Sequence, residues 1–241
     1  MGFWCSASKQ GKKRLVNQDH VCIDNRMLFA AVADGMGGPA GGERASMIAA
    51  ERVYDYWKSL RGDISGFDPI SELKSAVLDA NMEVYETAAE SVTYSRMGTT
   101  LAVAVVINMC LYYAWVGDTR IYLLRKGEPV CLTKDHTRAQ DMVDIGILSK
   151  SQYSSSSRSK ELTRYIGADE FVAVDTNTLH LVKGDLIFIA TDGVFEGITD
   201  TELRSLLERS LTPETILSRL MDDNGIFRGS DDRTVVVAKI R

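Results

Sequence analysis

Histidine and cysteine, the residues that most often bind zinc, are scarce in this sequence. There are three histidines in 241 residues, and the four cysteines form no CxxC pair. Zinc sites take closely spaced ligands from these residue types, so the scarcity argues against zinc chemistry. Such scattered cysteines are also no disulfide framework, and we interpret them as reduced thiols of a cytoplasmic protein. They are Cys5, Cys22, Cys110 and Cys131.

Long apolar runs and an excess of basic charge are missing too. No window approaches the roughly 18 consecutive apolar residues of a membrane span, and no signal peptide opens the chain. The net charge of −5 gives no support for nucleic acid as a partner. We therefore expect a cytoplasmic protein with neither a membrane nor a nucleic-acid partner.

The chain is long enough for one large domain or two small ones. Its 45% of hydrophobic residues can form a sizeable core, and no linker-like stretch divides it. We predict a single domain over residues 1–241. A polar region from Arg138 to Lys160 is expected to be an excursion from the core.

Apolar runs of strand length recur along the chain. They are rich in Val, Ile, Leu and Tyr and are bounded by Gly, Asp and Asn, which is typical of β-strands. The predicted strands are Phe3–Ala7, Val21–Ile23, Met27–Ala33, Thr99–Ile107, Leu111–Val116, Arg120–Arg125, Leu186–Ala190 and Thr234–Ile240.

Helices are predicted where apolar residues recur every three or four positions. The four ranges are Glu43–Leu60, Pro69–Glu90, Asp200–Arg209 and Pro213–Leu220. Strands joined in hairpins, with long helices between them, favour an α+β layer arrangement over strict βαβ alternation.

Four aspartates lie at the ends of strongly apolar strands: Asp34, Asp118, Asp192 and Asp231. One such residue is usually a turn residue, but strands of one sheet system end near each other, so four can converge. Converging carboxylates repel one another unless cations neutralise them. Oxygen ligands of this kind suit hard divalent cations, Mg²⁺ or Mn²⁺.

Several glycines follow Asp34, beginning with Gly35 and continuing to Gly42. The Gly35 carbonyl could bind a cation, and the later glycines could leave room for a phosphate group. The alternative is that the chain turns sharply there for packing reasons. A nucleotide-binding loop is disfavoured, because no Gly-Lys-Ser/Thr follows and the spacing does not match a dinucleotide fingerprint.

The motifs of the chain, taken together and in order, resemble those of the metal-dependent protein serine/threonine phosphatases of type 2C (the PPM family), in their compact bacterial form. Any one motif would be weak evidence, but the resemblance covers essentially the whole chain. The motifs are Arg14–Asp19 (RLVNQD), Val32–Gly38 (VADGMGG), Gly98–Thr100 (GTT), Val116–Arg120 (VGDTR), Leu132–Thr137 (LTKDHT), Leu162–Gly167 (LTRYIG), Ala190–Gly193 (ATDG) and Ser230–Thr234 (SDDRT).

The resemblance implies an α+β fold in which a central β-sandwich of two antiparallel sheets is flanked by pairs of α-helices. It also implies a flap over about residues 138–160, near a metal site at one end of the sandwich. For the flap we predict a helix near Arg138–Ile145, followed by a mobile loop over the metals. We expect the helix to be held against the body by the apolar residues Met142, Val143, Ile145, Ile147 and Leu148.

The resemblance further implies a metal centre with two Mn²⁺ or Mg²⁺ ions. Asp34 would bridge both ions, and the Gly35 carbonyl would bind one of them. Asp192 and Asp231 would complete the other, and Asp19 would hold metal-bound water.

Two more site residues follow from the resemblance. Asp118 would help to hold a third, weaker ion, and Arg14 would bind the substrate phosphate. A hydroxide held between the cations would attack phosphorus in line, while the metals and Arg14 neutralise the developing charge. The activity implied is hydrolysis of phosphoserine and phosphothreonine in proteins, opposing a bacterial serine/threonine kinase, by an enzyme that we expect to be a monomer.

Three positions depart from the family pattern and leave alternatives open. Gln18 replaces the usual Glu, Pro39 stands where bacterial relatives often have His, and Asp232 replaces the usual Asn and would add charge beside the site. The general acid is therefore not identified. Two other functions remain: a catalytically silent module of this fold that binds phosphoproteins or senses a signal, and a hydrolase of small phosphomonoesters.

Overall fold

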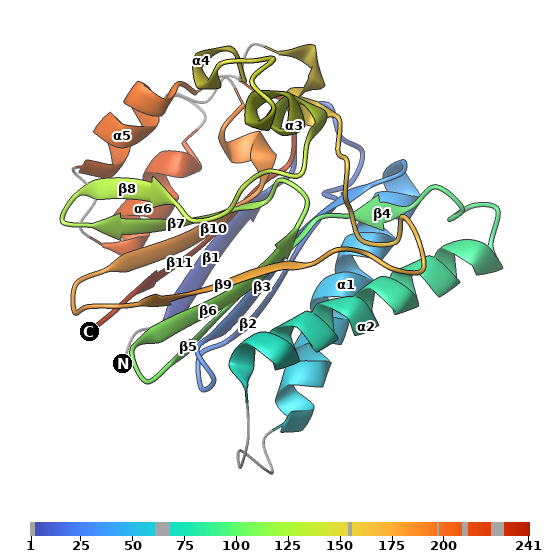
Figure 1. Cartoon of the computed structure of the whole chain (residues 1–241), viewed down its shortest axis with the longest axis horizontal. Helices are drawn as coiled ribbons and strands as arrows, with labels where there is room; N and C mark the ends of the chain where they lie inside the picture. Colours follow the sequence, from blue (N-terminus) through green and yellow to red (C-terminus); the bar gives the residue numbers. More distant parts are fainter. Residues whose placement is uncertain (1–2, 61–67, 154–155, 197, 209–211, 223–228) are drawn as a thin grey trace.

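Two antiparallel sheets stack face to face, and helices cover both outer faces. This arrangement comes from a computed structural model, which describes residues 3–60, 68–153, 156–196, 198–208, 212–222 and 229–241. Figure 1 shows α1 and α2 over one sheet and α5 and α6 over the other. The predicted α+β sandwich with flanking helix pairs is confirmed.

The first sheet has five strands among the described residues, and each adjacent pair is antiparallel. Their spatial order is β1 (Trp4–Lys9), β11 (Arg233–Lys239), β10 (Leu186–Ala190), β7 (Arg120–Arg125) and β8 (Glu128–Cys131). The sequence pattern did not predict the edge strand β8, because its four residues include Pro129 and show no apolar alternation.

The second sheet is also antiparallel. Its order is β2 (Asp19–Asp24), β3 (Phe29–Met36), β5 (Leu101–Ile107), β6 (Cys110–Val116) and β9 (Asp175–His180), and the short β4 (Gly98–Thr99) pairs with β3. Strand β9 was not predicted either, because its sequence, DTNTLH, is mostly polar and lies at the sheet edge.

The central strands are buried on both faces, which explains why they are continuous apolar runs. In β3, Ala30 and Val32 pack into the core between the sheets. Phe29, Ala31 and Ala33 alternate with them and pack into the core beneath α1 and α2. A third core joins the outer face of the first sheet to α5 and α6.

The main helices are α1 (Pro39–Ser59), α2 (Pro69–Glu90), α5 (Asp200–Glu208) and α6 (Pro213–Leu220). The four predicted helices are confirmed, but α1 begins four residues earlier than Glu43 and ends at Ser59, and the predicted last residue of α5, Arg209, lies outside the described residues. The start of α1 was missed because the glycines there were interpreted as a loop, whereas Pro39 occupies the first turn, where a missing N–H costs nothing. None of the helices in the described ranges is long and apolar enough to cross a membrane.

The flap contains α3 (Arg138–Asp144), α4 (Lys150–Tyr153) and a 3₁₀ helix (Ser157–Lys160), and it covers one end of the sandwich (Figure 1). The predicted helix is confirmed, but two of its expected anchors are wrong. Ile145 is 71% exposed and Ile147 is 62% exposed. The chain turns between them at Gly146, which has φ of 77°.

The predicted mobile loop in the flap is short helical structure where the chain is described. Residues 154–155 of the serine run lie outside the described residues, so the mobility of the loop stays a prediction. Tyr153 ties this segment to the body, because its hydroxyl donates to Asp135 Oδ2 at 2.5 Å.

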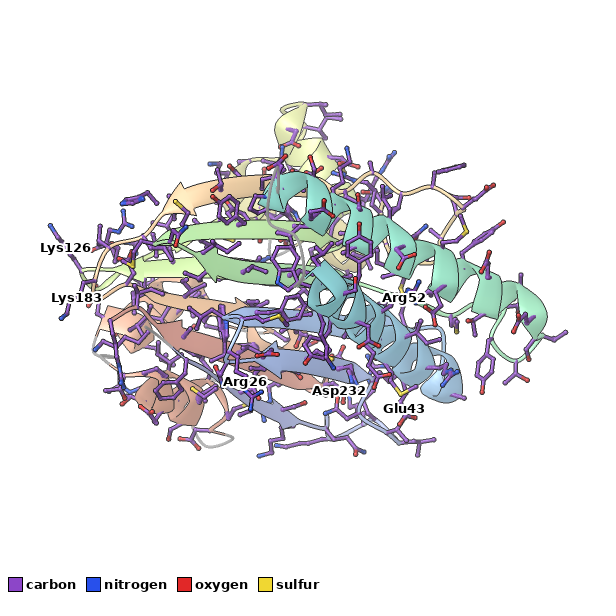
Figure 2. All side chains as sticks on the ribbon, turned by 90° about the horizontal axis from the view of Figure 1, so that it is seen from below. Arg26, Glu43, Arg52, Lys126, Lys183 and Asp232 are labelled. Carbon is purple, nitrogen blue, oxygen red and sulfur yellow. The ribbon has the colours of Figure 1, made fainter. Side chains whose placement is uncertain are left out.

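The two ends of the sandwich differ. Lys126 and Lys183, in the turns after β7 and β9, mark one end, and Asp232 and Glu43 lie away from it (Figure 2). The strands that precede Asp118 and Asp192 run toward the end where the flap lies, so the predicted acidic residues collect there.

Candidate active site

The pairing of β2 with β3 places Asp19 directly opposite Asp34. The backbone of Asp34 is held from the other side by the segment that begins β5. Its N–H donates to Thr100 Oγ1 at 3.0 Å, and its carbonyl accepts from the Thr100 N–H at 2.9 Å and from Thr99 Oγ1 at 2.8 Å. The backbone of Asp34 is therefore fixed between its two neighbours by hydrogen bonds that do not involve its carboxylate.

Two of the glycines after Asp34, Gly35 and Gly42, allow close packing of the backbone. A Cβ on Gly35 would lie 2.0 Å from the Gly42 carbonyl oxygen, and a Cβ on Gly42 would lie 2.7 Å from Gln18 Nε2. Only glycine allows the first turn of α1 to approach the strand this closely. The packing alternative therefore explains Gly35 and Gly42. The expectation that the later glycines leave room for a phosphate group stays a prediction, since a Cβ on Gly38 would meet nothing within 4 Å.

The acidic residues from both sheets converge on one volume. Burial raises the pKa of Asp34 well above its usual value, and the charges of Asp19, Asp192, Asp118 and Asp231 raise it further. These five residues, from four separate strand ends and from β2, are called the acid cluster below. The structure therefore brings together all the aspartates that were predicted to bind metal.

Two other members of the acid cluster, Asp118 and Asp19, also have a raised pKa. Burial and then Asp192 and Asp135 raise the pKa of Asp118 well above its usual value. Burial raises the pKa of Asp19 to about 7, although the Thr191 hydroxyl donates to its Oδ2 at 3.0 Å. Buried carboxylates at such close quarters favour a bound cation, because the charged form is costly without one.

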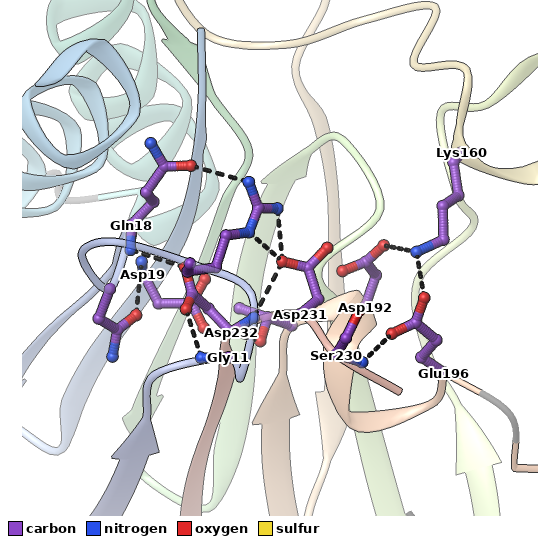
Figure 3. A network of polar contacts seen from close by, with 12 residues as sticks. Gly11, Gln18, Asp19, Lys160, Asp192, Glu196, Ser230, Asp231 and Asp232 are labelled. Atoms are coloured by element: carbon purple, nitrogen blue, oxygen red, sulfur yellow. Dashed lines mark hydrogen bonds and ion pairs between the residues drawn. The ribbon is translucent and has the colours of Figure 1, made fainter. Parts of the chain in front are cut away.

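Two basic side chains partly neutralise the acid cluster (Figure 3). The Arg14 guanidinium donates from Nε and Nη2 to Asp231 Oδ1, at 2.8 and 2.5 Å. From the flap, Lys160 Nζ lies 4.0 Å from Asp192 Oδ2 and 2.8 Å from Glu196 Oε1. Sequence reasoning missed Lys160 and Glu196 as site residues, because neither stands in a strand-end pattern.

Asp232 plays a different part from its neighbour Asp231. Its two carboxylate oxygens accept from the backbone N–H groups of Gly11 and Gln18, each at 2.8 Å, and the residue is 2% exposed. Figure 3 shows these contacts on the loop that carries Arg14. Asp232 therefore clamps the 11–18 loop to the start of β11, and two backbone N–H groups stabilise its carboxylate. The alternation of side chains about a strand could have indicated that only one of two adjacent acids faces the site.

A cavity of about 1040 Å³ opens beside the acid cluster. Its lining includes Asp118 and Asp192 of the acid cluster, together with Arg120, Phe195, and Tyr153 and Lys160 of the flap. The flap thus forms part of the surface that a substrate next to the acid cluster would meet.

The residues present fit hard divalent cations in their chemistry. The donors are all oxygens, and Asp19 Oδ1 is buried without a hydrogen-bond partner among the described residues. No three His, Cys, Asp or Glu side chains in the described ranges are already arranged to hold an ion. In the structure, Arg14 contacts Asp231 and Lys160 lies near Asp192, so these cationic side chains stand beside two of the carboxylates.

The sequence and the fold both match known phosphatases. A profile of the family "Protein phosphatase 2C" matches residues 8–221. The chain is 27% identical over 234 residues to the "Serine/threonine phosphatase stp" of Listeria monocytogenes, with 95% of this chain and 92% of the relative covered.

Solved structures agree with this match. The crystal structure of the Mycobacterium tuberculosis serine/threonine phosphatase PstP/Ppp has a TM-score of 0.85 and 29% identity, with 100% of this chain and 99% of that chain covered. The catalytic domain of PstP in complex with two manganese ions has a TM-score of 0.82 and 28% identity, with the same coverage. The chain belongs to the protein phosphatase 2C family and is a serine/threonine protein phosphatase.

Proposed function

We propose that the acid cluster is the metal centre of this phosphatase and that it holds two Mn²⁺ or Mg²⁺ ions. Asp34 is assigned to both ions, the Gly35 carbonyl to one of them, and Asp192 and Asp231 to the other. The observation that supports this assignment is the convergence of four other carboxylates on Asp34, whose pKa is raised well above its usual value by burial and then by their charges. The manganese-bound PstP domain, which shares the fold, supports it independently.

Divalent cations bound there would lower the pKa of a water molecule and neutralise charge on the phosphoryl group. Asp19 suits the task of holding such a water, because its Oδ2 is fixed by Thr191 while its Oδ1 is buried with no partner among the described residues. Asp118, which lines the cavity, is assigned to a third and weaker ion. A protonated carboxylate cannot serve in either role, so we expect activity to fall in acid.

Arg14 is assigned to the substrate phosphate. Its guanidinium is already at the acid cluster, and the side chain is 39% exposed, so one face remains open to a ligand. Nη1 also donates to Gln18 Oε1 at 3.2 Å, which orients the planar group. A guanidinium fixed in this way can offer two parallel donors to a phosphate.

The substrates that we propose are phosphoserine and phosphothreonine in proteins phosphorylated by a bacterial serine/threonine kinase, and the enzyme would act on them as a cytoplasmic monomer. Proteins phosphorylated by such a kinase should lose phosphate when the enzyme and Mn²⁺ are added. If only proteins phosphorylated by unrelated kinases lost phosphate, the pairing would be wrong. A single species of about 27 kDa in sedimentation would support the monomer.

One comparison of substrates tests the metal centre and separates the alternative functions. Chelator-treated protein is assayed with a phosphothreonine peptide, a nucleotide and an aryl phosphate, before and after Mn²⁺ is restored. We expect Mn²⁺-dependent turnover that is fastest on the phosphopeptide. Preference for the nucleotide or the aryl phosphate would favour a small-phosphomonoester hydrolase, and binding without turnover would favour a silent module.

A further inference from the structure

His136 is a buried polar residue with no role in the mechanism above. Both of its ring nitrogens make hydrogen bonds, and the residue is 3% exposed. Nδ1 lies 3.0 Å from the backbone nitrogen of Gly117, and Nε2 lies 3.2 Å from Asp175 Oδ2. Gly117 immediately precedes Asp118, so the imidazole is hydrogen-bonded to the backbone next to this member of the acid cluster.

The two contacts determine the tautomer of the ring. A backbone N–H can only donate, so Nδ1 accepts from Gly117 and carries no proton. The ring proton is therefore on Nε2, which donates to Asp175. Arg164 Nη1 holds the other oxygen of Asp175 at 2.9 Å, and the Trp115 ring stacks on the imidazole with centroids 6.0 Å apart.

His136 makes hydrogen bonds to both the N–H and the carbonyl of Gly117, the residue before Asp118. The backbone N–H of His136 donates to the Gly117 carbonyl at 3.0 Å, and the side chain accepts from the Gly117 N–H. Gly117 has φ of 102°, and a Cβ there would lie 2.6 Å from the Thr100 side chain. Only glycine therefore fits this backbone, and among the described residues the partner of its N–H is His136 Nδ1.

We propose that His136 is a positioning residue that directs Asp118 toward the acid cluster by accepting the Gly117 amide at Nδ1. Without that acceptor, the peptide between Val116 and Gly117 can rotate. The backbone of Asp118, and with it the position of the carboxylate, is then no longer fixed. This inference rests on the proposed function, because the ion assigned to Asp118 is what the positioning would serve.

Two conservative variants separate the two contacts of the ring. In His136→Asn the amide oxygen stands where Nδ1 stood, so the Gly117 bond is kept and the Asp175 bond is lost. In His136→Gln the longer amide reaches the Nε2 position, so the Asp175 bond is kept and the Gly117 bond is lost. Each variant loses one buried bond, so thermal melts should show both folded and destabilised to a similar extent.

The readout is equilibrium binding of Mn²⁺ to chelator-treated protein, followed by the electron paramagnetic resonance of free Mn²⁺. We expect His136→Gln to bind the weakest ion about tenfold less tightly, which corresponds to one lost hydrogen bond. His136→Asn should bind it as the wild type does, and the tighter ions should be unchanged in both variants. Equal binding by both variants, or weaker binding by His136→Asn alone, would overturn the proposal.

Asp118→Asn distinguishes the two ways to fail. If it leaves Mn²⁺ binding unchanged, the ion assigned to Asp118 is wrong, and this inference falls with it. If it loses the weakest ion while His136→Gln binds that ion normally, the proposed function stands and only the role of His136 is refuted.

Discussion

The clamp formed by Asp232 offers a quantitative test of how the 11–18 loop, which carries Arg14, is held. In Asp232→Ala, the N–H groups of Gly11 and Gln18 lose their acceptors, and both bonds are 2.8 Å long in a site that is 2% exposed. A buried donor left without a partner costs about 1–3 kcal/mol, so two give about 2–6 kcal/mol. Water can enter the space left by the carboxylate, and we therefore expect a loss of about 3 kcal/mol.

Two further variants make the number interpretable. Asp232→Asn keeps one acceptor oxygen, and its NH₂ group faces the other donor, so the loss should be intermediate, about 1–2 kcal/mol. Asp55→Ala removes a carboxylate from the exposed face of α1 and should change stability by less than about 0.5 kcal/mol. The loss in Asp232→Ala should also raise KM for a phosphopeptide, since Arg14 is on the released loop.

The assay is urea unfolding of the chelator-treated protein, followed by tryptophan fluorescence. The ranking that we expect is wild type, Asp55→Ala, Asp232→Asn and Asp232→Ala, from most to least stable. If Asp232→Ala unfolded at the same urea concentration as Asp55→Ala, the two bonds would not hold the loop, and the reasoning would be refuted.

Three other predictions concern charge and the flap. In chelator-treated protein, the raised pKa values of Asp19 and Asp34 mean that the folded state keeps protons which the unfolded chain has released. Stability should therefore fall as pH rises from 3.8 to about 7, and saturating Mn²⁺ should abolish the fall; a melting temperature that is flat over this window would contradict the shared burial of the acids. Arg14→Ala should raise KM for phosphopeptide at least about tenfold, while Mn²⁺ affinity measured by calorimetry should not weaken, because the guanidinium competes with cations for Asp231; an unchanged KM would make Arg14 an ordinary loop residue. Tyr153→Phe removes the hydroxyl that donates to Asp135, so limited proteolysis of the flap should quicken and phosphopeptide turnover should drop more than aryl phosphate turnover; equal drops would mean that the flap supports the fold.

Much of the fold was predictable because its signals are local. Helices α2 and α6 have the predicted bounds, since each begins with Pro in the first turn and carries an apolar stripe. The central strands were found because they are buried on both faces. Edge strands β8 and β9 gave no such signal, since β8 is four residues long and contains Pro129, and β9 is mostly polar.

The site was predictable only in part. Four members of the acid cluster could be inferred because each lies at the end of an apolar strand, and strand ends of one sandwich meet. Asp19 begins β2 instead, and only the family resemblance indicated it. Three other contacts depend on which distant segment of the chain lies opposite. They are the hydrogen bonds of Asp232 to the 11–18 loop, the approach of Lys160 to Asp192, and the hydrogen bond of Tyr153 to Asp135. Those pairings are set by tertiary packing, and no spacing along the chain encodes them.

The most direct test of the metal centre is the number of Mn²⁺ ions bound at equilibrium by wild type and by Asp34→Asn, measured beside phosphopeptide turnover. Asparagine keeps the size and the backbone contacts of Asp34 and removes the charge that would bridge two ions. We predict at least two ions on the wild type, with turnover that disappears on chelation. We also predict that Asp34→Asn loses tight binding and turnover together. An Asp34→Asn variant that kept wild-type turnover, or a chelated wild type that remained active, would contradict the account.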